Sequence, residues 1–131
     1  MSKTITIAEI GINHNGDVNI AKLLILEAQK AGFDAVKFQK RTVKEVYSPS
    51  DLDRHRDSPF GTTNREQKNG LELGKNEYDE IDRYCKEIGI DWFASAWDLD
   101  SQEFISRYNF KFNKIASPML TIEPLLNKVA S

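Results

Sequence analysis

Cysteine is almost missing from this sequence, because Cys85 is the only one among 131 residues. A single cysteine excludes an intramolecular disulfide framework and a cysteine-based zinc cluster. The chain also lacks a dense basic stretch and has a formal net charge of -2, so we expect no nucleic-acid or anionic-membrane surface. No apolar run approaches the ~20 residues of a membrane span, and no signal peptide precedes the first strand-like run. We therefore expect a soluble, cytoplasmic protein.

What the sequence does contain is an alternation of strand-like and helix-like segments. Hydrophobic residues make up 40% and charged residues 29%, a balance typical of one globular domain. Strands are predicted at residues 5–10, 35–39, 92–96 and 112–116. The helix signals are Asp17 as a cap with Gly32 as a stop, Asn76 as a cap with Gly89 as a stop, a start near Asp100, and Thr121 as a cap. This β-α-β-α-β-α-β-α order predicts a parallel sheet covered by helices.

Residues 41–74 differ from the rest of the chain, because they combine several Pro and Gly residues with many charges and have no sustained period. A connection of this length inside a compact domain is usually functional or mobile. We expect it to be the least regular region, and to cover part of a binding site.

Three of the four predicted strands carry a charge where a buried parallel strand should be apolar. These residues are Glu9, Lys37 and Lys114, each toward the end of its strand. They could form a structural ion pair inside the sheet. However, ligands of parallel sheets bind at the carboxyl ends of the strands, and two cations with one anion suit a ligand that carries phosphate or carboxylate.

Polar residues lie beside these strand ends. Asn13 and His14 belong to the loop after the first strand, where His14 could be a general base, a metal ligand or a hydrogen-bonded loop residue. Ser95 and Ser117 close the third and fourth predicted strands, and either hydroxyl could donate to a phosphate. Gln39 follows Lys37 by two residues. We include these five residues as candidate substrate-binding residues.

Three segments together resemble the N-terminal part of N-acetylneuraminate (sialic acid) synthases. They are "AEIGINHNG" at 8–16, "AGFDAVKFQK" at 31–40 and "NKIAS" at 113–117, and "WFASAWD" at 92–98 fits the same frame. The resemblance implies a TIM (β/α)8 barrel, of which residues 1–131 would supply about the first four βα units, a half barrel. The C-terminal half barrel and an antifreeze-like domain would then be absent from this chain.

The resemblance also implies a reaction. Such enzymes condense phosphoenolpyruvate with an N-acetylated hexose such as N-acetylmannosamine, and release phosphate from a nine-carbon 2-keto acid. It implies a divalent metal, expected to be manganese, whose histidine ligands would lie outside this chain, and an intact enzyme that is a homo-oligomer. We expect the chain alone to be inactive. Two alternatives stay open: a Schiff-base lysine aldolase on the same barrel, and a non-catalytic fragment that binds a phosphorylated small molecule.

Carried over by matching motifs, the resemblance makes Glu9 a residue near the sugar aldehyde and metal. It makes Lys37 and Lys114 the lysines that hold the carboxylate and phosphate of phosphoenolpyruvate, with Ser117 beside them. The sequence departs from the family pattern at two places. Pro118 and Met119 stand where Gly-Glu is common, and Ala96 stands at a threonine position of the third strand.

Overall fold

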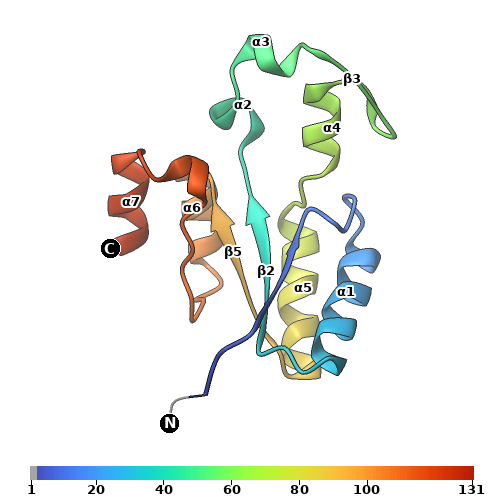
Figure 1. Cartoon of the computed structure of the whole chain (residues 1–131), viewed down its shortest axis with the longest axis vertical. Coiled ribbons are helices and arrows are strands. Elements are labelled where there is room, and N and C mark those ends of the chain that lie inside the picture. The colour runs from blue at the N-terminus through green and yellow to red at the C-terminus, as the bar shows by residue number, and fades with distance from the viewer. Residues whose placement is uncertain (1–2) are drawn as a thin grey trace.

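A three-stranded parallel sheet with helices packed on one face forms the centre of the molecule (Figure 1). The structure is a computed structural model that describes residues 3–131. The strand order is β1-β2-β5, with bounds Ile7–Gly11, Ala35–Lys40 and Asp91–Ala96. Helices α1 (Val18–Lys30) and α5 (Lys75–Ile88) lie side by side against this sheet. The predicted α/β class with parallel strands is confirmed.

Local signals in the sequence explain where the first long helix begins and ends. The Asp17 carboxylate accepts a hydrogen bond from the Asn19 backbone N–H at 2.7 Å, which caps the start of α1. Gly32 follows the end of α1 with φ +84°, a left-handed conformation that glycine adopts most easily. Both predicted ends of this helix are therefore confirmed.

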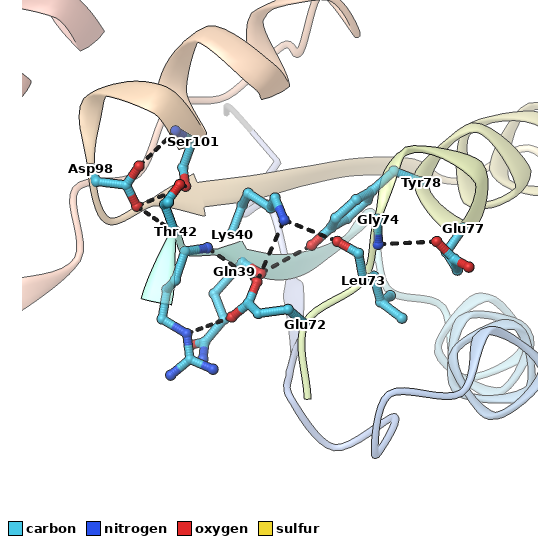
Figure 2. Close-up of polar contacts among 11 residues, drawn as sticks. Gln39, Lys40, Thr42, Glu72, Leu73, Gly74, Glu77, Tyr78, Asp98 and Ser101 are labelled. Atoms are coloured by element: carbon cyan, nitrogen blue, oxygen red, sulfur yellow. Dashed lines mark hydrogen bonds and ion pairs between the residues drawn. The ribbon is translucent and has the colours of Figure 1, made fainter. Parts of the chain in front are cut away.

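The start of α5 was predicted two residues too late. Its N-cap is Gly74 and not Asn76, because the Glu77 carboxylate reaches back to the Gly74 backbone N–H at 3.0 Å (Figure 2). Its end at Gly89, with φ +77°, is as predicted.

The core lies between the sheet and its covering helices. Alternate residues of the strands point to this side, and they include Val36, Phe38 and Trp92. The rings of Tyr78 and Trp92 stack there with centroids 5.6 Å apart, and Ile105 of helix α6 (Leu99–Ser106) packs on the same cluster. The other face of the sheet carries the remaining alternate residues, among them the predicted site residues of β1 and β2.

The prediction that residues 41–74 would be the least regular region is wrong. This segment forms five short elements: α2 (Val43–Val46), α3 (Pro49–Leu52), β3 (His55–Ser58), β4 (Gly61–Thr63) and α4 (Asn64–Gly70). Strands β3 and β4 pair as an antiparallel hairpin, separate from the main sheet. In Figure 1 these elements gather beyond the carboxyl ends of β2 and β5, the side on which ligands of parallel sheets bind.

Local capping chemistry, and not apolar periodicity, stabilises this segment. Thr63 and Glu66 form a reciprocal capping box at the start of α4. The sequence shows this signal as Thr-x-x-Glu, but a search for an apolar period overlooks it.

The predicted fourth strand is absent. Residues 112–116 have no regular secondary structure and lead into a 3₁₀ helix, η1 (Ser117–Met119). The Phe112 ring lies 5.4 Å from that of Phe93, so a side-chain contact holds the segment near β5 where strand pairing was expected. A parallel strand here would have only one neighbour within the described chain, and that lowers the gain from forming it.

The last two helices also start slightly away from their predicted positions. Asp98, and not Asp100, caps α6, since its carboxylate accepts from the Ser101 backbone N–H at 2.8 Å. Helix α7 (Glu123–Ala130) starts after Ile122 and not after Thr121. Within residues 3–131, every helix is too short or too polar to cross a bilayer.

Candidate active site

Strands β1 and β2 bring Glu9 and Lys37 together. The two residues are partners in the parallel register, and Lys37 Nζ lies 2.9 Å from Glu9 Oε2. The Lys37 side chain is only 7% exposed, whereas that of Glu9 is 61% exposed. The pair therefore consists of a buried cation and a carboxylate that is open to solvent, on the sheet face opposite the core residues Val36 and Phe38.

Strand β5 adds a hydroxyl to this pair. Ser95 is buried, and its Oγ lies 3.4 Å from Lys37 Nζ, with the Phe38 carbonyl oxygen at the same distance. Gln39 faces Ser95 in the strand register, and its backbone carbonyl accepts a hydrogen bond from the Tyr78 hydroxyl (Figure 2). An ammonium group has three donors, and two of its three contacts here are long. Lys37 therefore has hydrogen-bonding capacity left for a ligand oxygen.

The loop between β1 and α1 is ordered by its own hydrogen bonds. The Asn13 amide donates to the Ile10 carbonyl at 2.9 Å, and His14 Nδ1 accepts from the Gly16 backbone N–H at 3.0 Å. His14 is buried against Phe38, with ring centroids 5.9 Å apart. Burial lowers the pKa of His14, a hydrogen bond that the imidazole donates to the backbone of Gly11 opposes this, and the nearby Arg41 charge lowers it further. His14 is thus a neutral, packed imidazole, and Asn13 is exposed.

The same loop touches the segment beyond the strand ends. A side chain at Gly16 would place its Cβ 2.0 Å from the Gly70 carbonyl oxygen, and Gly16 has φ +74°. Glycine is therefore needed here both for its conformation and for the close approach of two backbones. This contact fixes the Asn13–Gly16 turn against the end of α4.

Lys114 and Ser117 are not brought to this group. Both are exposed, one in the irregular segment 112–116 and the other at the start of η1. No hydrogen bond or ion pair in the described part of the chain joins either of them to Lys37. The positions that depart from the family pattern differ in burial: Ala96 of β5 is buried in the core, Pro118 is exposed, and Met119 is half-buried and lines a pocket together with Trp97.

Sequence analysis missed a second group of charges just beyond β2. Arg41 is 5% exposed, and its Nε donates to Glu72 Oε1 at 2.6 Å while its Nη1 donates to the Tyr47 hydroxyl at 2.9 Å. Lys40 donates to the Leu73 carbonyl at 3.0 Å and lies 3.7 Å from the Glu72 carboxylate (Figure 2). The signal was the Lys-Arg pair directly after a buried strand, but its partner Glu72 lies in the segment that was predicted to be irregular.

Arg41 and Lys68 respond to their surroundings in opposite directions. Burial lowers the pKa of Arg41, but the charge of Glu72 and its hydrogen bond more than offset this, so the pKa is raised overall. Burial, together with the charges of Arg41 and Arg56, lowers the pKa of Lys68. The Glu72 carboxylate thus stabilises the charged form of Arg41, whereas Lys68 is partly buried near two further cations and one carboxylate, Asp51.

The side chains that the structure describes do not by themselves fit a metal. The described residues 3–131 include no group of three or more His, Cys, Asp or Glu side chains that could hold one. Glu9 is paired with Lys37, and His14 is buried with its Nδ1 already accepting a hydrogen bond. The two candidate ligands are thus already engaged within the chain.

Known proteins match almost the whole chain. Residues 24–131 match the NeuB family. The chain is 45% identical over 127 residues to the N-acetylneuraminate-9-phosphate synthase of Drosophila melanogaster, covering 95% of this chain and 34% of that protein. It is 35% identical over 137 residues to the N,N'-diacetyllegionaminic acid synthase of Campylobacter jejuni, covering 99% of this chain and 40% of that protein.

Solved structures agree with these sequence matches. The crystal structure of the N-acetylneuraminic acid synthetase of Leptospira borgpetersenii, in complex with citrate, superposes with a TM-score of 0.79 at 28% identity, covering 97% of this chain and 41% of that one. The chain spans about a third of the length of the curated relatives it matches. A family match over most of its residues, reinforced by this structural likeness, shows that the chain belongs to the NeuB family of sialic acid synthases.

Proposed function

We propose that residues 1–131 are the N-terminal half of a (β/α)8 barrel in a phosphoenolpyruvate-dependent synthase. The acceptor would be an N-acetylated hexose such as N-acetylmannosamine, and the product a nine-carbon 2-keto acid of the sialic, legionaminic or pseudaminic type. The relatives with these products in their names support this reaction class. The Leptospira synthetase binds citrate, a polycarboxylate, and this supports a site for anionic ligands in the family.

The observation that carries the proposal is the grouping of Glu9, Lys37 and Ser95 on one face, one residue from each strand of the sheet. Lys37 has unused hydrogen-bonding capacity and is surrounded by low-exposure residues, so its charge acts at short range in a poorly solvated place. An anionic substrate group placed there would exchange solvent for a fixed cation and a hydroxyl donor.

The reaction requires two functions from the site: binding of the anionic groups of phosphoenolpyruvate, and contact with the sugar aldehyde. C3 of phosphoenolpyruvate attacks the aldehyde carbon of the sugar, water adds at C2, and phosphate leaves by cleavage of the C–O bond. We assign Lys37 and Ser95 to binding of the anionic groups of phosphoenolpyruvate, and the exposed Glu9 to the aldehyde side. Lys114 and Ser117 would join the anion site only if residues 112–116 rearrange, and Asn13, His14 and Gln39 would line the site around it.

The lysine aldolase alternative is less well supported. A Schiff base requires an uncharged amine as nucleophile, whereas Lys37 forms an ion pair with the Glu9 carboxylate at 2.9 Å. Borohydride reduction in the presence of a keto or aldehyde substrate separates the two reactions, since only an aldolase would be labelled covalently.

The whole protein would require further parts. We propose that a divalent metal, manganese by family resemblance, is bound by residues outside this chain, and that the intact enzyme is a homo-oligomer. The metal would polarise the sugar aldehyde. Without those parts, residues 1–131 alone should release no phosphate from phosphoenolpyruvate.

Substitution of Lys37 tests the assignment directly. In the protein that carries this chain, Lys37→Met should lower the rate of phosphate release by about 10²–10³, the cost of removing one preorganised charged donor. Lys30→Met is the matched control, because Lys30 is an exposed lysine of α1 whose one ion pair among residues 3–131 is with Glu27. Near-normal turnover by the Lys37→Met protein would overturn the role given to this lysine.

A further inference from the structure

Strand β1 contains an irregularity directly after Glu9. In the pairing of β1 with β2, Glu9 faces Lys37. Two residues further on, Gly11 faces Phe38, the residue next to Lys37, so β1 has one residue more than β2 at this point. Such a bulge bends the strand and redirects the side chains beside it. Gly11 has φ +57°, a left-handed conformation that suits glycine, so the chain turns sharply just beyond Glu9.

His14 is hydrogen-bonded to the backbone on both sides of the turn that follows the bulge. Its Nδ1 accepts from the Gly16 N–H at 3.0 Å, and its ring donates to the backbone of Gly11. A neutral imidazole has one acceptor nitrogen and one donor nitrogen, and His14 uses both. Its ring also packs on Phe38, the strand partner of Gly11, with centroids 5.9 Å apart. His14 thus joins the bulge, the turn and β2.

Only the neutral form of His14 can make all of these contacts. A protonated imidazole has two donors and no acceptor, so it cannot accept a hydrogen bond from the Gly16 N–H. Two N–H groups would then point at each other within a buried turn, where neither reaches water. Protonation of His14 is therefore incompatible with the turn as it stands.

The charged and titratable groups around His14 supply no counter-charge. Arg41, directly after β2, carries a like charge. Glu72, which follows α4, is bound to Arg41 at 2.6 Å. Asp17 is engaged as the cap of α1, and the hydroxyl of Tyr78 on α5 donates to a carbonyl of β2. No carboxylate within residues 3–131 forms an ion pair with His14, so an added proton would stay uncompensated.

We propose that His14 is a positioning residue for the Glu9–Lys37 site. As the neutral imidazole, it ties Gly11 to Gly16, fixes the bulge, and thereby sets where the Glu9 carboxylate stands relative to Lys37. A proton taken up at Nδ1 breaks the bond from Gly16 and releases the turn from the end of α4. The effect on catalysis rests on the proposed function, whereas the attachment of the turn does not.

Nitrogen-15 NMR of the 131-residue chain tests the attachment without any activity. At about pH 8 the Nδ1 of His14 should be unprotonated, and the Gly16 amide should have the shift of a hydrogen-bonded group. As the pH falls below 6.5, both signals should change together. In His14→Asn, which keeps an acceptor, the Gly16 signal should stay constant. A proton on Nδ1 at about pH 8, or a Gly16 signal that does not follow the titration of His14, overturns the proposal.

Turnover of the longer protein tests the effect on Glu9. His14→Phe keeps an aromatic ring in place but removes the acceptor. It should lower kcat for phosphate release about tenfold to 100-fold, the cost of slightly misplacing a group that contacts the substrate. The KM for phosphoenolpyruvate should change little, because the lysine of the anion site is untouched. His14→Asn should recover most of the rate, and His55→Phe, at an exposed histidine, should leave the rate unchanged.

The outcomes separate this inference from the proposed function. If Lys37→Met proves fully active while the Gly16 signal follows the titration of His14, the proposed function fails and the attachment of the turn stands. A normal kcat in His14→Phe, or a loss that His14→Asn does not reverse, overturns the positioning role. If His14→Phe does not fold, the titrations of the unchanged protein and of His14→Asn decide the matter.

Discussion

At the scale of single residues, two buried cations on and after β2 are neutralised in different ways. Lys37 has an exposed carboxylate as its partner, whereas Arg41 has a largely buried one in Glu72. An exposed partner can turn to a ligand at little cost, but a buried partner cannot be withdrawn without leaving a charge unpaired. The first pair is thus suited to ligand exchange and the second to support of the fold.

Loss of Glu72 should consequently be severe. We expect Glu72→Gln to lower the free energy of unfolding by about 3–5 kcal/mol, because it leaves Arg41 and Lys40 without their carboxylate. Glu80→Gln is the comparison, since the Lys22–Glu80 pair is partly exposed and should cost less than about 1 kcal/mol. Urea unfolding of the three proteins measures both, and equal small losses would refute the structural role of Glu72.

A second residue-scale expectation concerns pH. Burial holds the pKa of His14 below its ordinary value of 6.5, so the unfolded chain binds a proton at a higher pH than the folded one. Stability should therefore rise with pH through the range just below 6.5 and be lost as the pH falls through it. His14→Asn, which keeps an acceptor for the Gly16 N–H, should flatten this dependence over about pH 5–8. His55→Asn should not, because His55 is exposed.

At the scale of elements, one carboxylate joins two segments that are far apart in the sequence. Asp98 accepts hydrogen bonds from the backbone N–H and hydroxyl of Ser101, and from the Thr42 backbone N–H at 2.7 Å (Figure 2). It therefore caps α6 and at the same time fixes the chain as it leaves β2 toward α2.

Asp98→Ala should accordingly cost more than an ordinary cap. A cap is worth about 1 kcal/mol, and the Thr42 N–H would lose its partner as well, so we expect about 2–3 kcal/mol in total. Asp100→Ala should change stability by less than about 0.5 kcal/mol, because Asp100 is exposed in the first turn of α6. Thermal unfolding of both variants checks this, and similar melting temperatures would mean that Asp98 is not the cap.

The sequence predicted those elements whose boundaries depend on neighbouring residues. Asp17 and Gly89 bound helices as local rules require, and the Glu9–Lys37 pairing follows from two adjacent parallel strands. The Arg41–Glu72 pair could not be predicted in this way, since it joins residues 31 apart across a segment without apolar period. The prediction of a strand at 112–116 was wrong for a related reason. The composition of this segment suits a strand, but strand formation depends on neighbouring strands that the local sequence does not describe.

At the scale of the whole molecule, the sheet has one central strand and two edge strands. Strand β2 pairs on both sides, whereas β1 and β5 each pair on one side within the described chain. Unpaired edges of parallel strands are normally covered. In the barrel that we propose, further strands would be added at the edge of β5.

Hydrogen exchange can follow this difference. In the 131-residue chain, amides of residues 112–116 should exchange much faster than those of 35–39, because the former make no regular backbone pairing. In the longer protein that we propose, pairing of 112–116 into the sheet should slow their exchange. The same protein should release phosphate, whereas we expect no release from the 131-residue chain. Slow exchange of 112–116 in the short chain would contradict this account.

The two tryptophans lie in different surroundings, so their fluorescence can report a local change without an added label. Trp97 stands over the Arg41 guanidinium at 5.7 Å, with its indole N–H buried and unpaired in the described structure. Trp92 is surrounded by Tyr78, Tyr108 and Phe110, and its N–H donates to Asp82. An anion bound close to the Arg41 guanidinium should shift the fluorescence emission of Trp97 and leave the emission of Trp92 unchanged. A Trp92→Phe protein would then report anion binding near Arg41 in real time from its one remaining tryptophan.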